Sequence, residues 1–178
     1  MNDKSISIVS GYSINLPAIK NRLIPLVENL QQKGFKITIF SPCKFKLELK
    51  NNLEINYVKL NLEEDLSENL IIRAFKEIYK SFKLLNLAYN KNDKYIYIGT
   101  PSIFNLLFSR YKYKNQFLDI RDITWEYLPE KNFFSLLLKK LFTIISIKKL
   151  RNFSVITCTN NSELKYLKNK IQKKQILY

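Results

Sequence analysis

Short apolar runs alternate along the chain with longer stretches in which apolar residues recur every three or four positions. The short runs predict buried β-strands, and the second pattern predicts amphipathic helices. The predicted strands cover residues 5–10, 35–40, 95–98, 116–120 and 154–158, with a weaker strand at 55–58 and a final one that begins at 175.

Helices are predicted in the intervals between these strands. The first begins near Leu16 and carries apolar residues through position 30, with Pro17 in its first turn. Pro25 predicts a kink or a broken start, and Gly34 is in the usual position of a C-cap. Further helices are predicted where residues 66, 70, 74, 78 and 82 stack at four-residue steps, over 103–111, over about 129–150, and after Asn160.

This alternation of strands with helices predicts βαβ units and a parallel sheet with helices on both faces. We therefore expect an α/β fold, a Rossmann-like three-layer sandwich with a mainly parallel sheet, as one domain over residues 1–178. Ligands of such sheets bind beyond the carboxyl ends of the strands. The residues at those ends are Gly11, Tyr12, Ser13, Ser41, Pro42, Gly99, Thr100, Pro101, residues 121–126, Thr159 and Asn160.

The charge of the chain is strongly positive but does not indicate a nucleic-acid site. The formal net charge is +15 over 178 residues, yet the chain has five arginines, and its lysines are scattered over every segment. Specific base or phosphate recognition favours the two-pronged arginine side chain, so we expect no nucleic-acid partner. A diffuse positive field is still able to attract anionic lipid head groups.

Several classes of chemistry are disfavoured by composition. The chain has no histidine and no CxxC pair, which removes the commonest zinc ligands and any imidazole base. Cys43 and Cys158 lie far apart beside apolar runs and are expected to be reduced, buried thiols. Residues 1–4 are polar and lead directly into a strand, so we expect no signal peptide and a cytoplasmic protein. The loop after residue 10 has one glycine, and no GxxxxGK[ST] occurs, which argues against dinucleotide and P-loop sites.

The chemically richest segment is residues 118–126, where an apolar strand passes into acids, a base and an aromatic residue. Residues 119–126, DIRDITWE, are similar to the DxRDxWPE segment of GT-B glycosyltransferases with a family-4-like N-terminal domain. Residues 33–39, KGFKITI, resemble the RGHeVtV stretch of that family, residues 97–102 its strand ending in small residues and proline, and residues 155–160 its strand that opens a helix. The segment differs from the pattern by one extra residue before Trp125 and by lacking the proline after it.

The resemblance implies that the chain is the N-terminal, acceptor-side half of a glycosyltransferase. The family's second Rossmann domain binds the nucleotide-sugar donor. We expect that C-terminal domain to be absent here, through a truncated or split gene, or to be a separate partner chain. A glycan or lipid-linked acceptor, in surface polysaccharide or lipopolysaccharide synthesis, is implied as the other partner. No cofactor and no metal are expected, and this half alone is expected to be inactive.

Each candidate site residue has a functional and a structural interpretation. Asp122 and Glu126 are the candidate catalytic groups, able to accept a proton from the acceptor hydroxyl, and their alternative is helix capping or pairing with Lys131. Arg121 could hold a phosphate or carboxylate, or else pair with Asp122 or Glu126. Trp125 could stack on a sugar or pack in the core. The remaining candidates for substrate binding, whose alternatives are turns and helix caps, are Gly11, Tyr12, Thr100 and Asn160.

The helix over residues 133–147 leaves two interpretations open. Ser135, Lys139, Thr143 and Ser146 form one narrow polar stripe, and most other positions are apolar. Such a basic, largely apolar helix could lie in a membrane interface and hold the protein peripherally at the inner face of the plasma membrane. The preferred interpretation is a core helix buried against the sheet. For the whole chain, the alternatives to an enzyme half are a non-catalytic remnant or scaffold module and a basic membrane-surface or nucleic-acid binder.

Overall fold

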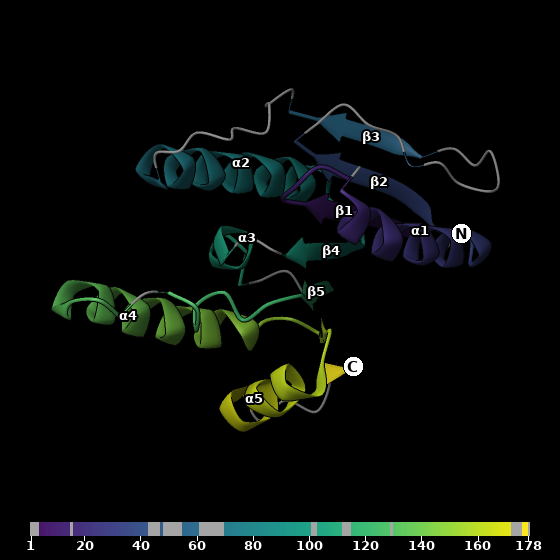
Figure 1. Cartoon of the computed structure of the whole chain (residues 1–178). Coiled ribbons are helices and arrows are strands. Elements are labelled where there is room, and N and C mark those ends of the chain that lie inside the picture. The colour runs from purple at the N-terminus through teal and green to yellow at the C-terminus, as the bar shows by residue number, and fades with distance from the viewer. Residues whose placement is uncertain are drawn as a thin grey trace.

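The computed structural model describes residues 4–14, 16–42, 47, 55–60, 70–100, 103–111, 115–128, 130–171 and 176–177. Strands and helices alternate along this part of the chain (Figure 1). The strands are β1 (Ser5–Ser10), β2 (Lys36–Ser41), β3 (Asn56–Lys59), β4 (Tyr95–Thr100), β5 (Gln116–Ile120), β6 (Val155–Cys158) and β7 (Ile176–Leu177). The helices are α1 (Pro17–Gln32), α2 (Leu70–Lys91), α3 (Ile103–Leu107), α4 (Phe133–Leu150) and α5 (Asn161–Ile171).

The strands form one seven-stranded sheet in the order β3-β2-β1-β4-β5-β6-β7, and every described pairing is parallel. The expected Rossmann-like sandwich is therefore confirmed. The chain leaves β1 toward one edge and, after β3, returns to build the other half from β4 outward. The strand order consequently reverses between β1 and β4, and a crevice opens at the carboxyl ends of parallel strands at such a point.

Two apolar clusters lie on the two faces of the sheet. On one face Ile19, Leu23 and Val27 of α1 pack on Ile6, Ile8, Ile37 and Ile39. On the other face Val9, Phe40, Ile96, Leu118 and Ile156 pack under residues of α2, α3, α4 and α5. Strand side chains point alternately to the two faces, which is why β1 contributes to both clusters.

Helix boundaries follow local chemistry. Asn132 caps α4 through a reciprocal pair with Ser135, so the helix begins at Phe133 and not at the expected residue 129. Helix α3 ends at Leu107, before the expected 111. Gly34 ends α1 with a φ of 76°, as expected for a C-terminal glycine. Helix α1 runs unbroken through the exposed Pro25, so the predicted broken start is wrong.

Candidate functional site

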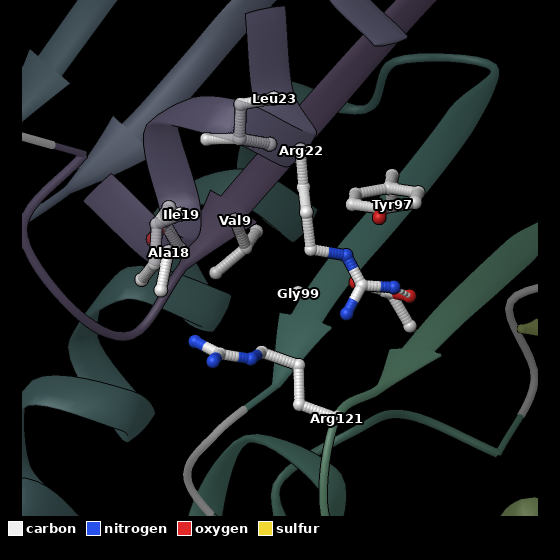
Figure 2. Close-up of a pocket in the computed structure, with 10 residues that line it drawn as sticks. Val9, Ala18, Ile19, Arg22, Leu23, Tyr97, Gly99 and Arg121 are labelled. Carbon is white, nitrogen blue, oxygen red and sulfur yellow. Dashed lines mark hydrogen bonds and ion pairs between the residues drawn. The ribbon is translucent and has the colours of Figure 1, made fainter. Parts of the chain in front are cut away.

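A recess opens at the point where the strand order reverses. Its volume is about 350 Å³, part of it open to solvent, and it lies between α1 and the carboxyl ends of β1, β4 and β5. Because this volume includes open solvent, the enclosed space is small and suits one small group of a larger ligand. Its lining residues are Val9, Ser10, Ala18, Ile19, Arg22, Leu23, Tyr97, Gly99, Asp119 and Arg121 (Figure 2).

One wall of the recess is an ion pair between α1 and β5. Arg22 Nη2 donates to Asp119 Oδ1, and the Asp119 carboxyl is buried. Thr157 Oγ1 in β6 donates to the same carboxylate oxygen at 2.8 Å. A buried carboxylate is tolerated only where cations and donors compensate its lost hydration. Asp119 therefore holds the Arg22 side chain against the sheet.

Tyr97 of β4 completes this wall and stays neutral. Burial, and next to it the negative charge of Asp119, raises the pKa of the Tyr97 hydroxyl far above its ordinary value. A protonated phenol beside Asp119 acts as a hydrogen-bond donor at neutral pH. Arg22 thus balances the Asp119 charge within the wall, and the net positive charge of the recess comes from Arg121.

Two guanidinium groups face the open space. In Figure 2 the Arg22 and Arg121 side chains reach toward it from α1 and from the residue after β5, on either side of Gly99. Arg22 Nη1 is buried and has no hydrogen-bond partner among the described residues. Among the described residues, the Arg121 side chain forms no ion pair or hydrogen bond. In particular, it pairs with neither Asp122 nor Glu126. Two arginines with free N–H groups around a small recess are suited to a phosphate or a carboxylate.

Gly99 forms the floor between these arginines. A Cβ added there would have ordinary contacts, with Val9 O at 3.6 Å and Tyr97 Cε1 at 3.8 Å. Tyr95, Tyr97 and Gly99 alternate along β4, so the missing side chain of Gly99 is on the same face as Tyr97. The glycine leaves space in the recess and lets a ligand approach the strand backbone.

Gly11 and Tyr12 lie beside the recess and do not line it. A Cβ on Gly11 would lie 2.6 Å from Asn105 Nδ2, and Asn105 is fully buried, so the glycine permits α3 to approach the first loop. The Tyr12 hydroxyl donates to Glu77 Oε1 at 3.1 Å. Burial, with the Glu77 carboxylate second, raises the pKa of Tyr12 to about 12. Both residues thus have structural contacts at this end of the sheet.

The three candidates after Arg121 separate in space. Asp122 is exposed, and its side chain has no partner among the described residues. Trp125 is 2% exposed within the core, and its Nε1 donates to Tyr166 Oη at 3.2 Å. The Tyr166 hydroxyl in turn donates to Glu126 Oε1, and burial followed by this bond raises the pKa of Tyr166 to about 12. Trp125 and Glu126 therefore link the loop after β5 to α5. For Trp125 this corresponds to the packing alternative predicted from the sequence.

Asn160 and Thr100 are the remaining candidates. Asn160 Oδ1 accepts from the Glu163 backbone N–H at 2.8 Å, and the Glu163 carboxylate reaches back to Thr159. Asn160 therefore caps α5, the structural alternative. Thr100 ends β4, and its side chain, with Pro101 and Ser102, lies outside the described residues. Asn160 is not among the described residues that line the recess.

Arg22 was not among the predicted site residues, because only the β1–β4 reversal brings α1 over β5. One signal in the sequence was available: arginine is rare in this lysine-rich chain, and Arg22 is one of five. Arginine in such a background marks positions where its fork geometry is used. The part of the chain that the structure describes contains no group of three or more His, Cys, Asp or Glu residues placed to hold a metal ion.

Comparison with known proteins supports the fold. No family model matches the chain. The structure is similar to sucrose-phosphate synthase from Thermosynechococcus elongatus, with a TM-score of 0.62, 12% identity, and coverage of 98% of this chain and 47% of that one. At this identity the likeness concerns the fold alone. The chain therefore has the α/β architecture of a Rossmann-like domain, corresponding to one half of a GT-B fold.

Two sequence matches cover less than half of the chain. Both are to pyridoxal-dependent decarboxylase domain-containing protein 1. The human protein is 32% identical over 82 residues, and the Bos taurus protein is 32% identical over 90 residues. These matches cover 43% and 48% of this chain and 10% and 11% of the relatives. The chain thus spans about a tenth of the length of these curated relatives, and the matches do not define its family.

Proposed function

We propose that this chain is the acceptor-binding half of a glycosyltransferase that moves a sugar from a nucleotide-sugar donor to an acceptor hydroxyl. The observation that carries the proposal is the recess at the β1–β4 reversal, with the free N–H groups of Arg22 and Arg121 around it. The fold likeness to a solved synthase and the DIRDITWE segment are consistent with the same class. A role in surface polysaccharide or lipopolysaccharide synthesis is supported by the sequence resemblance alone.

In this proposal the recess holds an anionic group of a glycan or lipid-linked acceptor. Arg121 and Arg22 bind the phosphate or carboxylate, and the reactive hydroxyl projects toward the exposed loop after β5. The hydroxyl oxygen attacks the anomeric carbon, its proton passes to a carboxylate, and the nucleoside diphosphate leaves. The donor is bound by a second Rossmann domain, and the reaction needs no metal.

Asp122 and Glu126 are the proposed proton acceptors, and their surroundings differ. Asp122 is exposed and has no described side-chain partner, so its oxygens are free to meet an acceptor hydroxyl. Glu126 already accepts from the Tyr166 hydroxyl. A general base must reach the proton that it removes. Of the two, Asp122 is therefore the better-placed base, and Glu126 would act only if the Tyr166 contact opens.

The test is sugar transfer by the chain combined with a nucleotide-sugar-binding Rossmann domain, fused or co-expressed. We expect Asp122→Ala to lower kcat by about 10²-fold or more, the contribution typical of a general base, while Glu126→Ala has a smaller effect. Lys165 is an exposed residue of α5, and the Lys165→Ala variant is the control that should retain full turnover. Unchanged turnover in both carboxylate variants would remove them from the mechanism.

A second candidate is a binding module without catalysis. The observation that favours it is the Trp125–Tyr166–Glu126 chain of hydrogen bonds, which uses two predicted site residues for packing. Such a module would bind an anionic sugar through Arg121 and transfer nothing. Binding without turnover in the combined protein, under conditions where an active homologous enzyme turns over, would establish this alternative.

A further inference from the structure

Helix α4 presents its apolar side away from the protein. Ser146 is fully buried, Ser135, Lys139 and Thr143 are half-buried, and these four form the polar stripe of the helix. The preferred interpretation from the sequence, a core helix with its apolar residues against the sheet, is therefore wrong for most of its length. Surface helices normally have the opposite orientation, with the polar side in water.

Apart from Lys148, the residues opposite the buried line of α4 are apolar. Leu137 and Ser146 are nine residues apart, which is about half a turn away around the helix axis at about 100° per residue. Leu137, Leu141 and Ile144 repeat along that outer line, and Ile144 is 60% exposed. The exposed large apolar residues of α4 are Phe133, Phe134, Leu136, Leu137, Leu138, Leu141, Ile144 and Ile145.

The apolar surface continues across the neighbouring helices. Figure 1 shows α3 between α2 and α4, and α3 contacts both of them. Ile72, Phe75, Tyr79 and Phe82 form an exposed stripe on α2, and the Phe82 ring meets the Phe108 ring edge to face at 5.7 Å between centroids. We call the exposed apolar residues of α2 and α4 with the α3 segment between them the α2–α4 face. Apolar patches of this kind mark sites that bind a partner or a membrane.

The exposed charges that the described part of α2 and α4 presents are mostly positive. Helix α4 contains no acidic residue, and Lys140 and Lys148 are exposed on it. On α2 the exposed cations are Arg73, Lys76, Lys83 and, at its C-terminal end, Lys91. Among the described residues near this face, the acids are engaged: Glu130 accepts from Lys139 at 2.6 Å, and Glu77 pairs with Arg73 at 3.5 Å. An apolar face with a cationic border complements an anionic lipid surface.

We infer that the α2–α4 face docks on the surface of an anionic membrane, with α4 lying in the plane of the interface. None of the described helices is long and apolar enough to cross a bilayer. The apolar residues of α4 enter the boundary between head groups and acyl chains, and Lys140 and Lys148 extend to the phosphates. This inference concerns a surface distinct from the recess and does not depend on the proposed reaction.

The test is co-sedimentation of the full chain with vesicles of phosphatidylcholine alone or mixed with phosphatidylglycerol. We expect binding to the mixed vesicles and little to neutral ones. Leu137→Gln/Ile144→Gln should abolish it, and Lys140→Gln/Lys148→Gln should weaken it about tenfold. Lys165→Gln/Lys168→Gln on α5 removes the same charge from exposed positions elsewhere and should bind like the wild type.

The variants are checked for folding by circular dichroism, because all four substituted positions of α4 are exposed and the fold should be retained. Equal losses in the two lysine pairs would overturn the inference, since they would assign binding to the overall charge. Absence of binding to anionic vesicles would overturn it as well. A wild-type dimer that Leu137→Gln/Ile144→Gln dissociates, without vesicle binding, would assign the face to a second copy of the chain.

Discussion

Arg22 and Arg121 have the same side chain and different roles in the recess. Arg22 is fixed by a buried carboxylate and offers one remaining nitrogen, whereas Arg121 offers its whole guanidinium group. A fixed cation beside a free one is a suitable arrangement for an anion, because little side-chain freedom remains to be lost at the fixed position. Arg121 was predicted as a binding residue because of the segment in which it lies, and in the structure it lines the recess.

The Arg22–Asp119 pair should contribute measurably to stability. Arg22→Met leaves a buried carboxylate without its cation, and we expect a loss of about 2 kcal/mol in the free energy of unfolding, less than for a fully buried pair because Arg22 is partly exposed. Adding Asp119→Asn to Arg22→Met should recover part of the loss. Urea denaturation gives these values.

Arg121→Met is the matched control for this stability prediction, since the Arg121 side chain has no described partner. Its free energy of unfolding should stay within about 0.5 kcal/mol of the wild type. A loss equal to that of Arg22→Met would contradict the distinction drawn between the two arginines.

At the scale of elements, the sequence predicted most strands closely and failed on the orientation of α4. Residues 5–10, 95–98 and 116–120 were predicted as strands, and they lie in β1, β4 and β5. Periodicity locates a polar stripe on a helix but does not say which side meets the protein. For α4 the usual assumption that apolar residues face inward gave the wrong side.

The sequence predicted a kink or a broken start at Pro25, and helix α1 continues through this residue. It has no N–H to donate within α1, so one helical hydrogen bond is missing there. Because Pro25 is exposed, water can solvate the freed carbonyl, and the helix continues to Gln32.

Pro25→Ala should therefore raise the free energy of unfolding by about 1–3 kcal/mol, since the restored hydrogen bond outweighs the added freedom of the unfolded chain. Pro17→Ala in the same helix is the matched control. Proline is favourable at the first helical position, so this variant should be neutral or slightly destabilised. Equal effects of the two substitutions in urea denaturation would contradict the interpretation.

At the scale of the whole molecule, the fold class followed from the alternation of patterns, but the site needed the topology. The order of the sheet places the reversal between β1 and β4, and this brings residues from positions 9 to 121 around one recess. Gly99, Arg121 and the loop after β1 were predicted at this edge because they follow strands. Trp125 and Asn160 follow strands too, yet one is buried in the core and the other caps α5, which the pattern alone could not distinguish.

The recess lies on the α1 face of the sheet, and the α2–α4 face lies on the opposite side of the sheet. In Figure 1, α2 and α4 extend past the arrowheads of β1 and β4, toward the end of the sheet that carries the recess. If the α2–α4 face docks on a membrane, a lipid-linked acceptor therefore has to extend past the carboxyl ends of the strands to reach Arg121. This relation is a proposal and rests on both of the preceding ones.

The most direct measurement is the binding of a hexose phosphate to the chain, followed by amide chemical shifts in NMR. We expect the shifts to concentrate at residues 10–11, 18–23, 99 and 119–121. Inorganic phosphate should compete, and the uncharged hexose should bind far more weakly. Arg121→Gln should weaken binding by about 10- to 100-fold, as expected for the loss of charge-assisted hydrogen bonds. Shifts scattered over the surface lysines and unchanged in Arg121→Gln, or no binding at all, would contradict the assignment of the recess as the acceptor site.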